Sequence, residues 1–465
     1  MRSPISKENL NKFGRTTLYT LIYATSGYLL YPILGLKKST TFEKELKIDP
    51  NYKPKVAVII PARNKGPYIY EVLESIIKQT YLPSRIMVTN DYSTDNTLDG
   101  ILKFSNEYFG GITCIKISDD KEICKGNKRF KNLDFILINH TKQNLGKQRS
   151  LNEMIKMLDE NEYELTATID ADTKLHPKWL ETMIPYHSDP RVAATYGWVH
   201  LWDEKSNGFL KFSRMIEYLF LLPFYRRLTN PNSHWTMSGS NILYKTSILK
   251  RYPIPEHMKE NAAEDLLHTV ELLAKGYYII FVPKAIAYSQ EDLDFKGFVK
   301  QTSRWMKGSF YVLWERILKD KDIIKNLNWV YKLQIGALYT LPYYLALINY
   351  NLIQGIITGN INYLMIPLTD LLFFFGIGLY NYKKYKEHIE KPLRYYITRF
   401  PLYYLARNLI LIPYAIGLWK YLELKMKRST NNVKQELDSL SKSYPSVRPI
   451  IEYPSLINVY KNTNY

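Results

Sequence analysis

The sequence predicts an α/β domain set between membrane helices. Two observations lead to this prediction: strand-like and helix-like patterns alternate from residue 55 to about residue 310, and long charge-free stretches lie on both sides of that block. We therefore divide the 465 residues into an N-terminal segment (1–50), a cytosolic α/β domain (51–320), a membrane region (321–425) and a polar tail (426–465).

Three apolar runs define the expected strands of the domain. Residues 56–60 form a β-branched run before Pro61, residues 85–89 form a second, and residues 166–169 form a third. A helical spacing of apolar residues follows the first run. Strands that alternate with helices favour a parallel sheet, in which ligands bind at the carboxyl ends of the strands.

The membrane helices are expected at four places. Thr16–Leu36 contains 21 uncharged residues, which is long enough to cross a bilayer, and it lacks the small-residue cleavage site of a signal peptide. No charge occurs between Lys332 and Asp370, and Thr358–Asn360 divides this region into helices over about 333–355 and 361–380. A further apolar stretch covers 400–419.

Lysine and arginine set the expected orientation of these helices. The short loop around Thr358 has none, whereas five basic residues lie between 383 and 394. The loop is therefore expected outside, with the α/β domain on the cytosolic face. The 400–419 stretch is left open between a membrane span, which would place its basic tail outside, and an interfacial or re-entrant segment. For Asp370 and Arg407, a structural ion pair or snorkelling is favoured over a role in substrate passage.

Composition narrows the classes of partner. The net charge of +19 suits anionic lipids, phosphorylated substrates or nucleic acid. No zinc-finger spacing or RNA-binding aromatic motif is present, so nucleic acid is not expected. The two cysteines, Cys114 and Cys124, are too few for a disulfide framework, and we expect them on a reducing cytosolic face without a role.

Asp170 and Asp172 follow the third predicted strand directly. Residues i and i+2 leave a strand on the same side, so both carboxylates can face one ligand. One or two carboxylates together with phosphate oxygens are typical of a Mg²⁺ site, and such a metal would neutralise a leaving diphosphate. Taken alone, two acids after a strand are more often turn or cap residues.

Further polar groups occur at the ends of the same predicted elements. Asp91 can accept hydrogen bonds from a nucleoside, and Lys147 can offset phosphate charge. Downstream, Asp265 suits a general base, with Glu264 as its helper or as a first-turn helix residue. Arg304 could bind a diphosphate, and Trp305 offers a flat face for a sugar. Each has an ordinary structural alternative as a cap, turn, solvated or packing residue.

Seven short motifs in a fixed order then resemble a known family. They are PARN (61–64), NDYSTD (90–95), NLGK (144–147), DAD (170–172), SGSN (238–241), AED (263–265) and QTSRW (301–305). Their order, with membrane segments alongside, is similar to the processive branch of glycosyltransferase family 2, which includes cellulose, chitin, hyaluronan and poly-N-acetylglucosamine synthases. The resemblance implies a GT-A fold, an inverting reaction, a nucleotide-diphosphate sugar that is usually UDP-linked, and Mg²⁺ or Mn²⁺.

The resemblance also implies roles for individual residues. The nucleotide-sugar would contact Arg63, Asn64, Asp91, Lys147, Asp170 and Arg304; the acceptor would contact Gln301, Trp305, Ser238 and Gly239; Asp172 with Asp170 would hold the metal; and Asp265 with Glu264 would be catalytic. It further implies that residues 295–310 lie at the membrane surface. Three positions depart from the family: Lys65 stands where an acid is usual, Asn90 replaces the first acid of an Asp pair, and Ala263 replaces a common threonine.

Several functions remain open at this point. The first is extension of a β-linked polysaccharide, and the second is transfer of one sugar to a lipid acceptor, as in ceramide glucosyltransferases. Polyprenyl-phosphate sugar synthesis ranks lower because that group generally lacks the Gln-x-x-Arg-Trp motif. A non-catalytic sugar-binding scaffold is disfavoured by the two carboxylates Asp172 and Asp265, since binding alone needs neither.

Overall fold

The computed structural model describes residues 45–443, except for 203–208, 257–262, 292–293 and 390. The chain divides into two compact units, Met1–Gly417 and Leu418–Tyr465. The first predicted membrane segment, Thr16–Leu36, lies outside the described residues.

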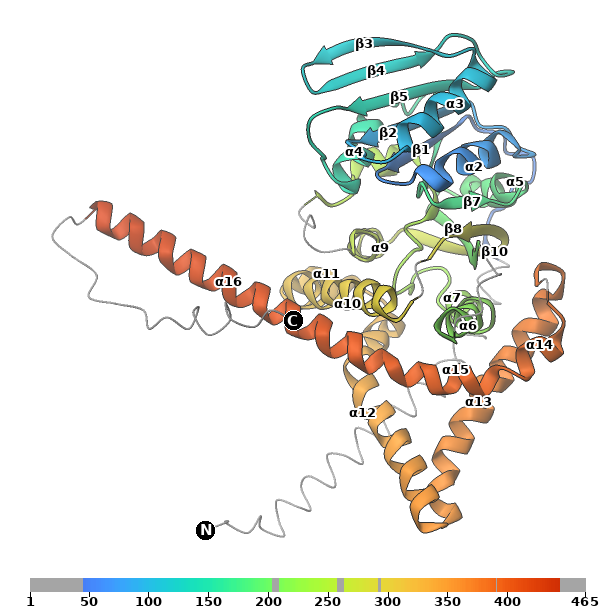
Figure 1. The fold of residues 1–465 in the computed structure, drawn as a ribbon, viewed down its shortest axis with the longest axis vertical. Helices are drawn as coiled ribbons and strands as arrows, with labels where there is room; N and C mark the ends of the chain where they lie inside the picture. Colours follow the sequence, from blue (N-terminus) through green and yellow to red (C-terminus); the bar gives the residue numbers. More distant parts are fainter. Residues whose placement is uncertain (1–44, 203–208, 257–262, 292–293, 390, 444–465) are drawn as a thin grey trace. The chain divides into compact units, whose positions relative to one another are not determined.

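Within the described residues, ten strands form a single sheet (Figure 1). In spatial order they run β3–β4–β5–β2–β1–β6–β9–β8–β10–β7. Their bounds are β1 Val56–Ala62, β2 Arg85–Asp91, β3 Ile112–Ser118, β4 Lys121–Gly126, β5 Asp134–His140, β6 Leu165–Ile169, β7 Thr173–Leu175, β8 Val192–Leu201, β9 Asn241–Lys245 and β10 Tyr278–Ser289. The three runs predicted as strands correspond to β1, β2 and β6.

The helices connect these strands and continue beyond the sheet. Their bounds are α2 Gly66–Ile77, α3 Thr97–Phe109, α4 Lys147–Lys156, α5 Trp179–Met183, α6 Phe209–Ile216, α7 Leu222–Leu228, α8 Thr246–Arg251, α9 Glu264–Ala274, α10 Phe295–Tyr311, α11 Lys321–Asn326, α12 Trp329–Thr358, α13 Ile361–Tyr385, α14 Leu393–Ile397, α15 Phe400–Arg407 and α16 Leu411–Ser443. Two π-helical turns, Glu217–Leu221 and Val312–Ile317, follow α6 and α10.

Four neighbouring strands of the sheet are parallel and almost completely buried. β5, β2, β1 and β6 pair in parallel, so their carboxyl ends meet at one edge of the sheet. Residues 56–60 of β1 have no exposed surface, which explains why that strand reads as a continuous apolar run. Side chains of α2 and α3, such as Val72 and Phe104, complete the core on this part of the sheet.

β9 reverses the strand direction in the middle of the sheet. It runs antiparallel to both of its neighbours, β6 and β8. Its amino end therefore lies beside the carboxyl end of β6, with Asn241 opposite Ile169. This reversal brings the 238–241 motif to the same edge of the sheet as the Asp170–Asp172 turn.

Cys114 and Cys124 form a disulfide with each other, so the expectation that they have no role was wrong. β3 and β4 make an antiparallel hairpin at the edge of the sheet, and Cys114 stands directly opposite Cys124 in its register. Opposed side chains on neighbouring antiparallel strands are close enough to bond. The pairing depends on register, which two isolated cysteines do not reveal in a sequence.

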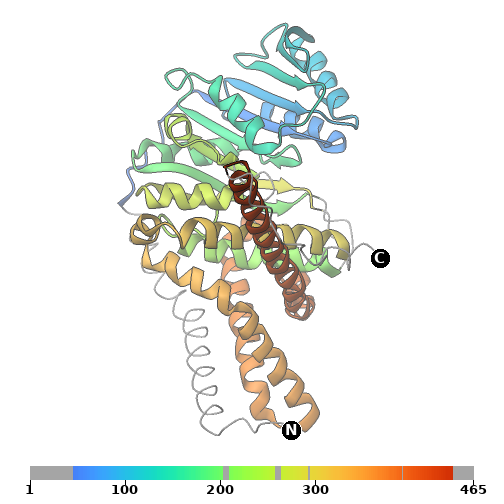
Figure 2. The same cartoon turned by 90° about the vertical axis from the view of Figure 1, so that its left-hand side faces the viewer.

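Helices α12 and α13 form an antiparallel hairpin (Figures 1 and 2). Gly355 lies against Leu364 across it, and its tip is formed by Gly359 in the left-handed conformation. Many apolar side chains of the hairpin face outward, among them Tyr343, Ile356, Ile357 and Ile361, each at least 70% exposed. In the part of the chain that is described, one helical stretch, Ile361–His388, is long and apolar enough to cross a membrane.

Asp370 and Arg407 form a structural ion pair with each other, which is one of the two alternatives favoured for each from the sequence. Arg407 Nη2 lies 2.5 Å from Asp370 Oδ2, both side chains are largely buried, and Tyr344 also donates to Asp370. The pair joins α13 to α15. The 400–419 stretch is interrupted at residues 408–410, and α16 then continues to Ser443, well into the segment expected as a polar tail.

Candidate functional site

The parallel strands deliver four of the predicted motifs to one edge of the sheet. Ala62 pairs with Asn90, and Asp91 pairs with His140, so the residues after β1, β2 and β5 are neighbours. Asp170 follows β6, which flanks β1 on its other side. The sequence motifs, far apart in the chain, therefore converge because parallel strands end together.

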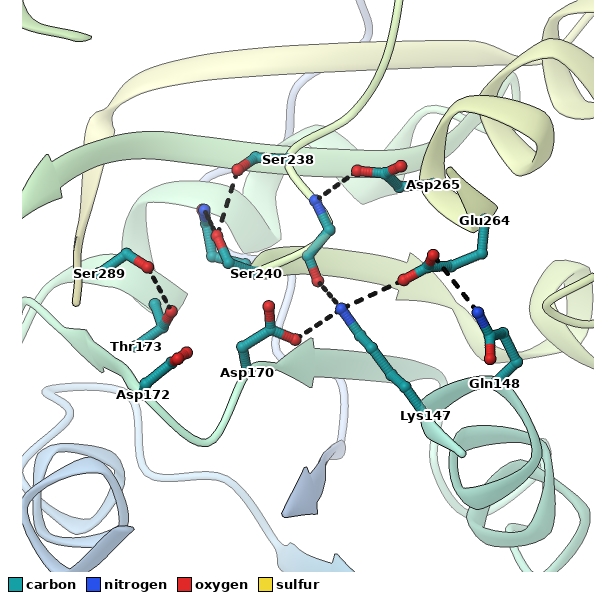
Figure 3. A network of polar contacts seen from close by, with 12 residues as sticks. Lys147, Gln148, Asp170, Asp172, Thr173, Ser238, Ser240, Glu264, Asp265 and Ser289 are labelled. Atoms are coloured by element: carbon teal, nitrogen blue, oxygen red, sulfur yellow. Dashed lines mark hydrogen bonds and ion pairs between the residues drawn. The ribbon is translucent and has the colours of Figure 1, made fainter. Parts of the chain in front are cut away.

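Lys147 lies at the centre of this site (Figure 3). Its Nζ atom is 2.7 Å from Asp170 Oδ1, 3.4 Å from Glu264 Oε1 and 3.4 Å from the Gly239 carbonyl oxygen. Burial would lower the pKa of this lysine, but the charges of Asp170 and Glu264 outweigh it and raise the pKa above its ordinary value. The side chain is thus a permanently charged cation held between two carboxylates.

The Asp170–Asp172 turn is fixed through its backbone. The amide of Thr173 donates to the Asp170 carbonyl at 2.9 Å, and the amide of Gln290 donates to the Asp172 carbonyl at 3.0 Å. Burial raises the pKa of Asp170, Lys147 opposes that rise, and Asp172 adds to it. Asp172 carries its own partner, because Lys65 Nζ lies 2.6 Å from its Oδ2 atom.

Asp265 lies in the first turn of α9, and helix N-termini favour acidic side chains. Its Oδ2 atom accepts a hydrogen bond from the Gly239 amide at 3.3 Å, and Oδ1 accepts one from the Leu266 amide at 2.8 Å. Burial, reinforced by the charge of Glu264, raises the pKa of Asp265 to about 6. A carboxyl with that pKa is suited to take up a proton near neutral pH.

Gly239 permits this close approach. A Cβ atom at Gly239 would lie 3.0 Å from Asp265 Oδ2 and 3.2 Å from Asp265 Cβ. The neighbouring Ser238 hydroxyl is within 3.2 Å of the Ser240 hydroxyl, and the Ser240 carbonyl accepts from the Asp170 amide. The loop before β9 therefore ties the Asp265 helix to the Asp170 turn.

Three residues predicted to contact the nucleotide hold loops of the site together. Asp91 Oδ1 and Oδ2 accept from the Leu145 and Gly146 amides at 2.6 and 2.8 Å. Asn64 Oδ1 accepts from the Thr94 amide at 2.8 Å. Arg63 faces Asn144, whose amide oxygen, when turned toward it, accepts from Nη1 and Nη2 at 3.2 and 3.1 Å.

The last motif lies on α10. Gln301 is half-buried, and its Oε1 atom has no hydrogen-bond partner among the described residues. Arg304 is exposed on the same helix, so the structure does not bring it into the Lys147 cluster. Trp305 is half-buried, and the Arg214 guanidinium stands 5.3 Å from its ring centre.

Sequence reasoning missed a buried polar cluster beside Trp305. Arg214 pairs with Glu217 at 2.8 Å and with Glu291 at 3.3 Å, and Tyr218 donates to Glu291. Glu291 is next to Gln290, whose amide bonds the Asp172 carbonyl, so the cluster reaches the Asp170–Asp172 turn. The cluster includes the π-helical turn Glu217–Leu221, and such turns often occur at functional sites. This turn is visible in the structure but has no recognisable pattern in the sequence.

The Asp170–Asp172 turn supplies the carboxylates that could hold a metal. Among the described residues, no three His, Cys, Asp or Glu side chains are grouped so that they could hold a metal by themselves. Asp170 and Asp172 nevertheless leave the same turn, and two carboxylates completed by phosphate oxygens are a common arrangement for Mg²⁺. The residues fit a divalent cation that is bound jointly with a diphosphate.

Comparison with known proteins agrees with this geometry. The sequence profile of Glycosyl transferase family 2 matches residues 57–253, and that of Glycosyl transferase family group 2 matches residues 165–382. The chain is 26% identical over 345 residues to a probable glycosyltransferase, YdaM, of Bacillus subtilis (68% of this chain, 73% of the relative). It is 25% identical over 328 residues to a poly-beta-1,6-N-acetyl-D-glucosamine synthase of Staphylococcus epidermidis (69% and 70%).

A solved structure has the same fold. It is the mannosyltransferase PcManGT of Pyrobaculum calidifontis in complex with GDP-mannose and Mn²⁺. The TM-score is 0.51 at 17% identity, and the match covers 87% of this chain and 99% of the other. The expected GT-A fold is therefore confirmed.

Proposed function

The chain belongs to glycosyltransferase family 2, and from this premise we propose that it transfers a sugar, with inversion, from a UDP-linked donor to a growing β-linked polysaccharide. One observation carries the proposal: Lys147 Nζ lies between Asp170 and Glu264, in the same cluster as the half-buried base candidate Asp265. A positive charge that can bind a diphosphate therefore lies next to a base that can deprotonate an acceptor hydroxyl.

The donor half of the site consists of Lys147 and the Asp170–Asp172 turn. When the sugar is transferred, the nucleoside diphosphate is the leaving group, and negative charge builds up on it. The Lys147 ammonium, held at 2.7 Å from Asp170, supplies a compensating positive charge at that point. Arg63, Asn64 and Asp91 border the nucleoside side of this site through the loops that they hold.

A divalent cation completes this half. Asp172 and Asp170 would hold Mg²⁺ or Mn²⁺, which supplies charge neutralisation for the diphosphate. Manganese accompanies the donor in the mannosyltransferase that shares this fold.

The acceptor half is centred on Asp265. In a single in-line displacement one base suffices, because no covalent intermediate forms. Asp265 takes the proton of the acceptor hydroxyl, and burial together with the charge of Glu264 holds the pKa of Asp265 at about 6. Gly239 and Ser238 shape the wall opposite, while Gln301 and Trp305 from α10 contact the acceptor sugar.

Poly-N-acetylglucosamine synthases among the relatives support a polysaccharide product. A second candidate is transfer of one sugar to a lipid. The outward apolar side chains of the α12–α13 hairpin favour it, because they present a surface that matches lipid chains. In both cases we place the protein as a multi-pass membrane protein with its sheet domain in the cytosol and no nucleic-acid partner.

The product assay separates these candidates. Full-length protein in detergent is incubated with Mg²⁺ or Mn²⁺ and radiolabelled UDP-sugars, with GDP-mannose as a further donor. High-molecular-weight label is expected; a single labelled lipid would replace the first candidate by the second. Transfer and donor hydrolysis that are both absent with all donors would refute a glycosyltransferase site.

Asp265→Asn tests the base directly. The substitution keeps the size of the side chain and removes its ability to accept a proton, so turnover should fall at least about 100-fold while UDP binding is retained. Asp119→Asn, at an exposed carboxylate 81% accessible in the β3–β4 hairpin, is the matched control. Near-normal turnover of Asp265→Asn would mean that another group is the base.

A further inference from the structure

Lys65 departs from the family pattern, and its position is well defined. It lies in the loop between β1 and α2, where its amide donates to Thr97 Oγ1 at 2.7 Å. Its carbonyl accepts from the Tyr68 and Ile69 amides at 2.9 and 3.0 Å, so the loop backbone is held by the first turn of α2. The side chain alone extends from this loop toward the Asp170–Asp172 turn.

The ammonium of Lys65 occupies one oxygen of the carboxylate that the metal requires. Nζ is 2.6 Å from Asp172 Oδ2, and the two side chains are 37% and 18% exposed. Asp172 is anchored separately, through its carbonyl and Gln290. The ion pair therefore connects two loops that are each fixed without it, and either partner could change its contact without unfolding the loop.

Lys65 and Lys147 have different places in the site. Lys147 contacts two carboxylates, Asp170 and Glu264, and the Gly239 carbonyl. Lys65 contacts one carboxylate among the described residues, that of Asp172, and its side chain is slightly more exposed than that of Lys147 (37% against 31%). A flexible lysine with one partially exposed ion pair gains little free energy from it, so the contact is easily exchanged.

We propose that Lys65 is a built-in competitor for the divalent cation at Asp172, and this rests on the metal role given to Asp172 above. A lysine ammonium and a metal ion cannot share Oδ2 at contact distance, because two cations there repel each other. Binding of the metal with a nucleotide diphosphate must therefore move the Lys65 ammonium off the carboxylate. The protein keeps Asp172 neutralised until that exchange, and it needs more metal than a chain without this lysine.

The test measures metal binding rather than turnover. Full-length protein in detergent is titrated with Mn²⁺, with and without UDP, and free Mn²⁺ is followed by its electron paramagnetic resonance signal. Lys65→Met removes the competing cation and should lower the apparent Kd for Mn²⁺ by about two- to fivefold, the range expected for loss of a partly exposed ion pair. Lys65→Arg keeps the charge and should stay near the wild type.

Two further variants make the result specific. Lys78→Met removes an exposed lysine that pairs with Glu74 on α2, and it controls for the change in net charge. Asp172→Asn should abolish most Mn²⁺ binding. If Asp172→Asn binds Mn²⁺ like the wild type, the metal role of Asp172 and with it the competition are both refuted. If Asp172→Asn loses the metal but Lys65→Met binds Mn²⁺ no more tightly than Lys78→Met, the competition alone is refuted.

Discussion

The pKa of Asp265 predicts how activity depends on pH. Burial and the charge of Glu264 raise this pKa from an ordinary 3.8 to about 6. A base must be ionised to accept a proton, so activity should be lost as the pH falls through about 6. At about pH 5, roughly one-tenth of such a carboxyl is ionised, and kcat/KM should be about tenfold below its plateau near pH 8.

Glu264→Gln separates the two causes of that pKa. The substitution removes the neighbouring charge but leaves Asp265 half-buried, so the acidic limb of the profile should move to lower pH. The assay is the initial rate at subsaturating donor between about pH 4.5 and pH 8.5, which reports on groups of the free enzyme. Glu162→Gln, at an exposed carboxylate beside Lys55, is the control. A flat profile over this range, or a limb that stays in place in Glu264→Gln, would refute the reasoning.

Three other substitutions have defined outcomes. Gly239→Ala places a Cβ 3.0 Å from Asp265 Oδ2, so turnover should fall about tenfold or more with little change in Tm; unchanged turnover would show that Asp265 can shift freely. Lys147→Met should weaken UDP binding about 10- to 100-fold by calorimetry, and full-strength binding would place the diphosphate elsewhere. Arg214→Met leaves Glu291 buried without its cation, so the free energy of unfolding measured with denaturant should fall by about 3–5 kcal/mol. Adding Glu291→Gln to the same chain should restore part of that free energy, and an equal loss in the single and double variants would contradict this.

The strands and the converging motifs were predictable because both depend on local patterns. The apolar runs of β1, β2 and β6 follow from burial on both faces of a parallel sheet, and parallel strands necessarily bring Asp91 and Asp170 to one edge. The family resemblance then supplied the roles. These predictions needed no knowledge of distant contacts.

The remaining features depend on contacts between distant segments. The Arg214–Glu291 pair joins α6 to the end of β10, and no spacing in the chain announces it. The disulfide needs the register of β3 on β4. The sequence showed that Lys65 departs from the family pattern. Its pairing with Asp172 depends on the direction of the side chain, which cannot be predicted from the sequence pattern alone.

The carboxylate of Asp91 could affect nucleotide binding indirectly, by positioning another residue. Its two oxygens accept hydrogen bonds from the Leu145 and Gly146 amides, which directly precede Lys147 at the start of α4. Removing that carboxylate would free the segment and misdirect the Lys147 ammonium, and so weaken the hold on a diphosphate even if Asp91 never touched the nucleotide. The losses in Asp91→Ala and Lys147→Met should accordingly be non-additive in a double-mutant cycle, since one side chain aims the other.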